Sequence, residues 1–413
     1  MKRKLLIVVF CIVSFASYSQ TIKVLFDAKK AEMAANTDWV VDADLYNIGT
    51  GTGGIMTVGA GNEANPQRYP TPAQSGITST TAETYWKGAL SSWGVACAKL
   101  GYTVETLPNS GTISYGNTAN AQDLVNYKVY VVCEPNIKYT TAEKTALMQF
   151  VQNGGGLFII ANHNNSDRNN DGWDALKIWN DFFSTNGIKV NPFGFTFDLS
   201  NFSQTTTNFA NLPTNTILHG SAGNPYRMKF SSGTSMTLNK TANSNVLGLV
   251  YKTGSSTTGL TGCMFASSKY GNGKVVSIGD SSPPDDGTGD TGDALYTGWS
   301  VDAGGDHARI IMNATIWLTN TAARFGDEET SNFVNVWPNP FNEELNVSFL
   351  NDNIETAVIS LYDLSGRMIS TQEYQTMDGV NQITVAGNEL SKGSYIVTIS
   401  KGGNMISKKV MKF

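Results

Sequence analysis

The segment Gly154-Gly155-Gly156-Leu157-Phe158-Ile159-Ile160-Ala161 joins three glycines to five consecutive apolar residues. An apolar run without alternation is typical of a strand that is buried on both faces of a sheet. The preceding residues, 140–152, begin with Thr-Thr-Ala-Glu, a pattern that predicts the start of a helix. A helix that returns through glycines to a buried strand indicates a parallel sheet with helices packed on it.

The rest of the first 320 residues repeats this alternation of apolar strands and helices. Strands are predicted at 23–26, 102–107, 127–133, 157–161 and 274–278, and helices at 81–100, 140–152 and 308–318. The sequence therefore predicts an α/β fold, in which a parallel sheet forms the middle of a three-layer sandwich. Residues 185–268 are rich in Asn, Thr and Ser, and we expect a β-rich insertion there.

The passage from helix through three glycines to a strand resembles the class I glutamine amidotransferase-like fold, which is flavodoxin-like. The resemblance covers roughly 21–163 and 270–320. Amidotransferases need a Cys on a sharp turn between a strand and a helix, with a His as base. The matching turn reads Ile160-Ala161-Asn162-His163-Asn164, without Cys or Ser, and no G-x-S-x-G or G-x-C-x-G occurs in the chain. Amidotransferase activity is therefore not expected.

The last eighty residues carry several short motifs in a fixed order. They read Val-Asn-Val-Trp-Pro-Asn-Pro-Phe from Val334, Leu-Tyr-Asp-Leu-Ser-Gly-Arg from Leu361, Gly-Ser-Tyr-Ile-Val from Gly393, and Lys-Lys-Val-Met-Lys-Phe from Lys408. This order resembles the Bacteroidetes type IX secretion system C-terminal sorting domain. The resemblance implies that residues 334–413 bind the secretion machinery, and that the cargo is afterwards released or anchored at the surface. Short alternating runs separated by turns predict a small β-sandwich for this segment.

The other end of the chain has the features of a signal peptide. A cationic start at 2–4 precedes an apolar stretch at 5–15, and small residues follow at 17–19, so cleavage is expected after Ser19. No apolar stretch is long enough to cross a membrane. The predicted organisation is a signal peptide at 1–19, an α/β cargo domain at 20–320, a linker at 321–333 and the sorting domain. The predicted destination is secretion or the outer cell surface, reached through the periplasm.

Charge and cysteine content limit the function further. The net charge of −5 argues against non-specific nucleic-acid binding, which needs a basic surface. Three cysteines remain after the predicted cleavage, Cys97, Cys133 and Cys263, and they are widely spaced in apolar surroundings. An odd number without a spacing pattern is not a disulfide framework, so we expect three buried, unpaired thiols.

Polar residues follow four of the predicted strands, and they are the candidate catalytic residues. Asp27, Glu134, His163 and Asp280 each lie at or just beyond a strand's carboxyl end. Ligands of open parallel sheets bind beyond this edge, so the four side chains are expected near one another. The alternative is that they only cap the ends of strands and the starts of the next helices.

A candidate calcium loop begins shortly after His163. The sequence Asp-Arg-Asn-Asn-Asp-Gly-Trp-Asp at 167–174 fits the D-x-N-x-D-G pattern, in which alternating oxygen side chains converge on one hard cation. The predicted ligands are Asp167, Asn169, Asp171 and Asp174. The twelfth position is Ile178, so the bidentate Glu of an EF-hand is absent. The alternative is an Asn- and Asp-rich surface turn.

The sequence is compatible with three hypotheses, of which two are functional and one is purely structural. The first is a calcium-stabilised domain that binds an extracellular glycan or other polymer without turnover. The second is a metal-dependent extracellular hydrolase, in which Asp27, Glu134 and Asp280 are ligands or acid–base groups and His163 is a base or ligand. The third is a surface protein without a ligand. Whether the cargo domain is an enzyme is not decided by the sequence.

Overall fold

The computed structural model describes residues 22–30, 39–42, 47–50, 56–59, 74–289, 295–319, 334–351, 356–377, 379–401 and 404–413. The predicted signal peptide (1–19) and the predicted linker (321–333) lie outside the described residues. In the described part of the chain, no helix has both the length and the apolar character needed to cross a membrane.

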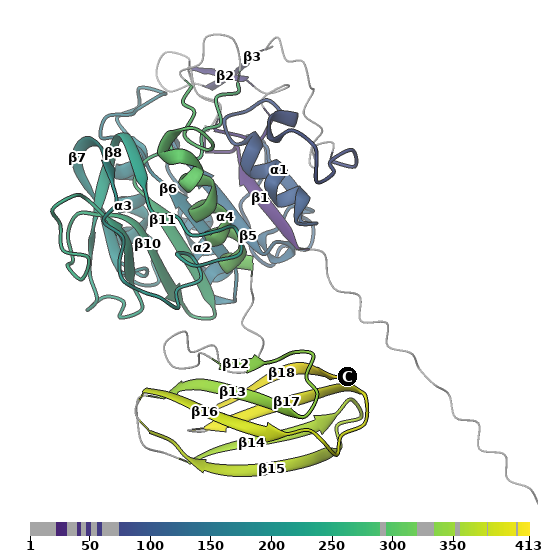
Figure 1. The fold of residues 1–413 in the computed structure, drawn as a ribbon. Helices are drawn as coiled ribbons and strands as arrows, with labels where there is room; N and C mark the ends of the chain where they lie inside the picture. Colours follow the sequence, from purple (N-terminus) through teal and green to yellow (C-terminus); the bar gives the residue numbers. More distant parts are fainter. Residues whose placement is uncertain are drawn as a thin grey trace, which may run out of the picture.

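Five parallel strands form one half of a nine-stranded sheet, in the order β4-β1-β5-β6-β11 (Figure 1). They are β1 (Lys23–Asp27), β4 (Thr103–Leu107), β5 (Val129–Cys133), β6 (Gly156–Ile160) and β11 (Gly273–Ile278). The five strands predicted from apolar runs are thus present. Because parallel strands run in one direction, all five carboxyl ends lie at the same edge of the sheet.

The other half of the same sheet is antiparallel. It consists of β7 (Phe195–Thr206), β8 (Met228–Leu238), β9 (Leu247–Tyr251) and β10 (Cys263–Tyr270). The path continues from β11 through β10 and β8 to β7, and β9 also pairs with β10. The prediction of an α/β fold with a large, mainly parallel sheet is confirmed in this general form. The more specific likeness to the amidotransferase-like fold stays a prediction.

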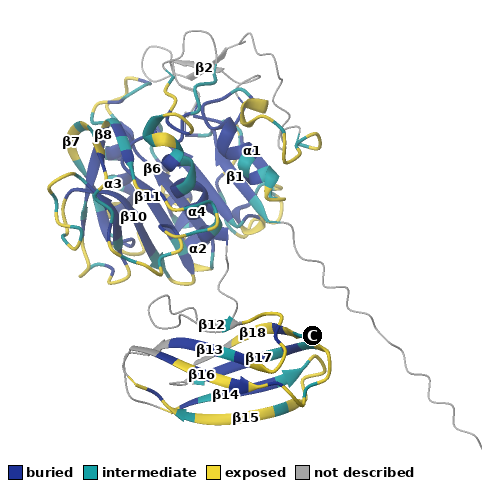
Figure 2. Cartoon of the chain, in the orientation of Figure 1, coloured by how far each residue is buried: buried dark blue, intermediate teal, exposed yellow. Residues whose placement is uncertain are grey.

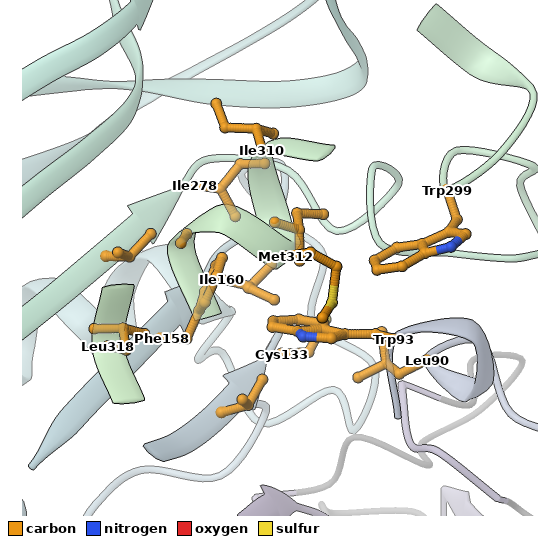
Figure 3. Close-up of a cluster of buried hydrophobic side chains, with 14 of the residues drawn as sticks. Leu90, Trp93, Cys133, Phe158, Ile160, Ile278, Trp299, Ile310, Met312 and Leu318 are labelled. Atoms are coloured by element: carbon orange, nitrogen blue, oxygen red, sulfur yellow. The ribbon is translucent and has the colours of Figure 1, made fainter. Parts of the chain in front are cut away.

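Helices cover both faces of the sheet. They are α1 (Ser91–Lys99), α2 (Thr141–Gln152), α3 (Ala175–Thr185) and α4 (Asp306–Thr319). In β6, Phe158 and Ile160 belong to the core cluster that contains α1 and α4, whereas Leu157 and Ile159 belong to the cluster of α2 and α3. This division explains why β6 is apolar at every position: successive side chains point to opposite faces, and both faces are buried (Figures 2 and 3).

Gly154, Gly155 and Gly156 form the tight turn from α2 into β6. Gly154 has φ +107°, a backbone conformation that residues other than glycine rarely adopt. At Gly155 an added Cβ would lie 2.3 Å from the ring of Phe150. The other end of α2 has the capping box that the sequence predicts, because Thr140 and Glu143 each accept a hydrogen bond from the other's backbone N–H.

The helix predicted at 81–100 is shorter than expected. A short 3₁₀ turn, η1 (Glu83–Tyr85), comes first, and α1 begins only at Ser91. The irregular residues between them pack against the backbone near Val40: the Leu90 N–H donates to the Val40 carbonyl at 3.0 Å. Gly88 lies so close that an added Cβ would be 2.3 Å from the same oxygen. This tertiary contact overrides the helical pattern.

The C-terminal strands form two antiparallel sheets. One has the order β12-β13-β16 and the other β15-β14-β17-β18. The strands are β12 (Val334–Trp337), β13 (Glu344–Asn351), β14 (Thr356–Asp363), β15 (Met368–Gln375), β16 (Gly379–Ala386), β17 (Gly393–Lys401) and β18 (Asn404–Lys412). Apolar residues of both sheets, such as Val347 and Val397, share one core cluster.

The Asn-Pro-Phe motif in this part has a clear structural role. The backbone N–H of Phe341 donates to the Met411 carbonyl at 2.8 Å, and the Phe413 N–H donates back to the Phe341 carbonyl at 3.0 Å. The Asn339 side-chain oxygen accepts from the Met411 N–H at 2.9 Å. The motif therefore fastens the final strand of the chain, and the Phe341 ring is buried in the shared core.

A second small pair of strands lies in the first hundred residues. β2 (Asn47–Thr50) and β3 (Met56–Gly59) are antiparallel partners and form a sheet of their own. The glycine-rich residues 51–55 between these two strands lie outside the described residues.

Candidate functional site

The register of the sheet brings three strand ends to the same level. Cys133 of β5 is the partner of Ile160 in β6, and Ile160 is the partner of Ile278 in β11. The residues that follow these positions therefore leave the sheet side by side. Among them are the predicted site residues Glu134 and Asp280.

Glu134 is the centre of this edge. Its side chain is fully buried, and its backbone has φ +52°, in the left-handed region that a residue with a side chain rarely adopts. One carboxylate oxygen accepts hydrogen bonds from the Ser166 hydroxyl and from Arg168 Nε, the latter at 3.1 Å. The other oxygen accepts from the Ser281 hydroxyl at 2.9 Å. One carboxylate thus joins the segments that follow β5, β6 and β11.

Asn136 reinforces the same junction through backbone contacts. Its amide oxygen accepts from the Arg168 N–H at 2.6 Å, and its amide nitrogen donates to the Glu134 carbonyl at 3.0 Å. The Asn169 side chain donates to the Asn136 carbonyl at 2.7 Å. The position of Arg168 is therefore fixed by its backbone and by its ion pair with Glu134.

Asp280 lies next to this junction and is fully buried. Its two oxygens accept from the backbone N–H groups of Ser231, at 2.5 Å, and Ser282, at 2.9 Å. Burial raises the pKa of Asp280 to about 7, and the nearby negative charge of Glu134 adds to the rise, although the backbone hydrogen bonds oppose it. A carboxyl group in this range can change protonation state near neutral pH.

Tyr296 brings an exposed aromatic ring to the same edge. The side chain is 40% exposed, and its backbone N–H is held by the Asp285 carboxylate at 2.7 Å. Burial raises the pKa of the Tyr296 phenol, and the negative charges of Asp280 and Glu134 raise it further, whereas Arg168 lowers it. The phenol therefore shares the electrostatic environment of Glu134, Arg168 and Asp280.

The other two candidate catalytic residues have partners of their own. The Asp27 carboxylate accepts from the Tyr130 hydroxyl and, at 2.7 Å, from the backbone N–H of Lys30, so it closes the turn after β1. His163 pairs through Nδ1 with the Asn164 carbonyl at 3.0 Å. Because a carbonyl can only accept, Nδ1 is the donor in this contact.

The carboxylates of the predicted calcium loop are engaged with backbone donors. Asp167 accepts from the Gly172 N–H at 2.6 Å, and Asp171 accepts from the Trp173 N–H at 2.9 Å. Asp174 is fully buried and caps α3 by accepting from the Lys177 N–H at 2.9 Å. Among the described residues, no group of three or more His, Cys, Asp or Glu side chains is arranged to hold a metal ion. Calcium binding stays a prediction.

Four residues at this edge of the sheet were not predicted as site residues from the sequence. They are Ser166, Arg168, Ser281 and Tyr296. Ser281 had a usable signal, because it directly follows Asp280 at a strand end. Arg168 had a weaker one, as the single cation inside the Asp- and Asn-rich loop. For Ser166 and Tyr296 the sequence carries no distinguishing pattern.

Cys97, Cys133 and Cys263 are buried, and in the described part of the chain none of them forms a disulfide, as the sequence predicts. Burial raises the pKa of the Cys97 thiol, and it raises that of Cys263 to about 12. The Cys133 side chain lies in the core cluster with α1 and α4, directly before Glu134 (Figure 3). Thiols in such surroundings act as small apolar side chains.

Comparison with known proteins identifies the C-terminal part. Residues 335–412 match the family described as "Secretion system C-terminal sorting domain". The chain is therefore a type IX secretion cargo, destined for the exterior or the cell surface. This sorting domain implies an interaction with the secretion machinery. None of the curated proteins matches the chain.

Three solved structures show a distant likeness to the chain. The "mmIFT52 N-terminal domain" is 13% identical, with a TM-score of 0.40, over 74% of this chain and 99% of that one. Dimeric latent PorU from Porphyromonas gingivalis is 17% identical, with a TM-score of 0.18, over 20% of this chain and 9% of that one. A β-glucuronidase from Parabacteroides merdae is 11% identical, with a TM-score of 0.14, over 20% of this chain and 13% of that one. None of these similarities is high enough to assign a function.

The raised pKa of Asp280 gives a testable pH dependence. In the folded protein this pKa is about 7, whereas in the unfolded chain it is about 3.9. Asp280 therefore contributes stability that is fully present below about pH 4 and is lost as the pH rises to about 7. Relative to an Asp280→Asn variant, the wild-type protein should lose about 4 kcal/mol of unfolding free energy across this range.

Urea denaturation of both proteins at several pH values measures this difference. His307 also contributes to the pH dependence, because burial lowers its pKa to about 4. Its contribution to stability falls as the pH drops from about 6.5 to 4, which is opposite to the change for Asp280. This contribution is the same in wild type and in Asp280→Asn, so it cancels in the comparison. Parallel stability curves for wild type and Asp280→Asn would contradict the assignment.

Proposed function

We propose that the exported protein binds an extracellular glycan or other polymer at the carboxyl edge of the parallel sheet. The observation that carries this proposal is the junction at Glu134, which gathers Arg168 and Ser281 from two other strand ends. Ligands of open α/β sheets bind beyond this edge. Strained backbone at φ +52° next to such an edge is a further indication of a site rather than of simple capping.

The chemistry of the edge suits a polyhydroxylated ligand. Polar groups on fixed backbone positions give directional hydrogen bonds, and an exposed ring offers an apolar surface for a sugar. Tyr296, which is 40% exposed, supplies the ring here. Trp173, in the loop after β6, instead packs against the core, with the Lys138 ammonium group 3.5 Å from its ring centroid. We also propose that the cargo domain, residues 20–320, has the class I glutamine amidotransferase-like fold, and that a linker at 321–333 joins it to the sorting domain.

A second candidate function is an extracellular hydrolase. It is favoured by one observation, namely that Asp280 has a pKa of about 7 and lies close to the charge of Glu134. A buried carboxyl group with a pKa near neutrality suits the role of general acid or general base. A metal-dependent form would use Asp27 or His163 in addition. Loss of turnover in Asp280→Asn, with binding retained, would distinguish this function from binding alone.

The binding proposal predicts specific losses in affinity gel electrophoresis with a panel of soluble polysaccharides. At least one polymer should retard the wild-type protein, and Tyr296→Ala and Arg168→Gln should each weaken this retardation about tenfold or more, because each removes a contact group at the edge. Tyr270→Ala is the matched control, since Tyr270 ends β10 near the amino end of β11. Unchanged retardation in both edge variants would contradict the proposal.

Calcium is proposed as a stabilising ion in the loop at 167–174. Calorimetry on the metal-stripped protein should show calcium binding with a Kd on the order of 10⁻⁶ M. The double variant Asp167→Ala/Asp171→Ala should abolish the heat, whereas Asp302→Ala, which removes a carboxylate paired with Lys229 outside the loop, should not. Absence of heat with the wild-type protein would overturn the calcium assignment, and the loop would then be an Asx-rich turn.

A further inference from the structure

An exposed aromatic and basic surface lies next to the N-terminal end of α4. Tyr226 is 57% exposed, and the guanidinium carbon of Arg227 lies 4.9 Å from the centroid of its ring. Val301, in the segment that leads into α4, is 65% exposed. We call Tyr226, Arg227, Lys229, Val301 and Arg309 the basic–aromatic platform.

The backbone under this platform is held by two buried residues at the start of α4. The Asp306 carboxylate is fully buried and accepts from the N–H groups of Tyr226, at 3.3 Å, and Arg227, at 3.0 Å. His307 accepts the Lys229 N–H at its Nε2, at 2.9 Å, and donates from Nδ1 to the Gly298 carbonyl at 2.8 Å. An exposed ring on a backbone fixed in this way is preorganised for contact with a ligand.

The cationic side chains of the platform are more exposed to solvent than the carboxylates that pair with them. The side chains of Arg227 and Arg309 are each 39% exposed and that of Lys229 is 40% exposed. Their carboxylate partners are less accessible, since Asp306 is fully buried and Asp302 is 22% exposed. The charge that solvent meets is therefore positive, on a chain whose net charge is −5. Such a local excess complements an anionic ligand.

One loop connects the platform to the edge around Glu134. At one end of this loop, the backbone N–H of Tyr296 donates to the Asp285 carboxylate, and the negative charges of Asp280 and Glu134 raise the pKa of the Tyr296 phenol. Further along, Gly298 contacts His307, and Asp302 pairs with Lys229 at 2.9 Å. The segment 296–302 therefore makes contacts at the edge through Asp285 and at the platform through Lys229.

We propose that the basic–aromatic platform binds an acidic polysaccharide, one with carboxylate or sulfate groups, which continues from the edge of the sheet. This inference rests on the proposed function and specifies its ligand. Tyr226 stacks on a sugar ring, while Arg227, Lys229 and Arg309 pair with the anionic groups. A single-stranded nucleic acid is the less suitable polyanion, because it is bound along grooves with several stacking rings in a positively charged surface.

The test compares polygalacturonate with its methyl ester, which has the same sugar rings without the charges. Affinity electrophoresis with the full chain should show polygalacturonate bound at least tenfold more tightly, with affinity that falls as salt is raised. Tyr226→Ala should weaken the binding of both polymers. Arg227→Gln/Lys229→Gln should remove most of the preference for the charged polymer, and Lys240→Gln, a change at an exposed lysine outside the platform, should leave it intact. Thermal unfolding confirms that each variant is folded.

The outcomes separate this inference from the function on which it rests. Equal binding of the two polymers, abolished by Tyr296→Ala, would overturn the preference for an acidic ligand and leave the proposed function standing. Binding of an oligothymidylate as tight as that of polygalacturonate would also overturn it, in favour of a general polyanion surface. Failure of both polymers to bind would overturn the acidic-polysaccharide inference, whereas the proposed function is contradicted only if no polymer of the wider polysaccharide panel binds.

Discussion

The buried carboxylate of Glu134 is the interaction on which the proposed site depends. Left-handed backbone at a residue with a side chain costs about 1–2 kcal/mol, and burying an ion pair adds a desolvation cost. Both costs are offset only while the partners stay in place. Removing one partner of a buried pair typically costs about 3–5 kcal/mol, so Glu134, Ser166, Arg168 and Ser281 stabilise one another as a unit.

This unit can form only because the sheet has already aligned the strand ends. The continuous apolar strands β5, β6 and β11 are buried between two helical layers, which fixes their register. The glycines before β6 allow α2 to return close to the sheet. Asp280 then lies beside Glu134 because β11 ends at the same level, and their proximity, together with burial, raises the pKa of Asp280. The chemistry of the edge therefore follows from the packing below it.

Much of this arrangement could be predicted from the sequence, because its signals are local. Apolar runs located the parallel strands, and the Thr-Thr-Ala-Glu pattern located the start of α2. The junction itself could not be predicted, since Glu134 meets Arg168 and Ser281 across 34 and 147 residues of chain. That Asp27 joins the other three residues stays a prediction, and its contact with the Lys30 N–H fits the alternative that such residues cap strand ends.

Hydrogen exchange of a Glu134→Ala variant tests the central claim most directly. The claim predicts faster amide exchange in the segments 162–174 and 280–289, which Glu134 holds, with β5, β6 and β11 still protected. Glu143→Ala, which removes a buried carboxylate paired with Lys30, is the matched control and should affect the start of α2 instead. Unchanged exchange in both segments of the Glu134 variant would contradict the account.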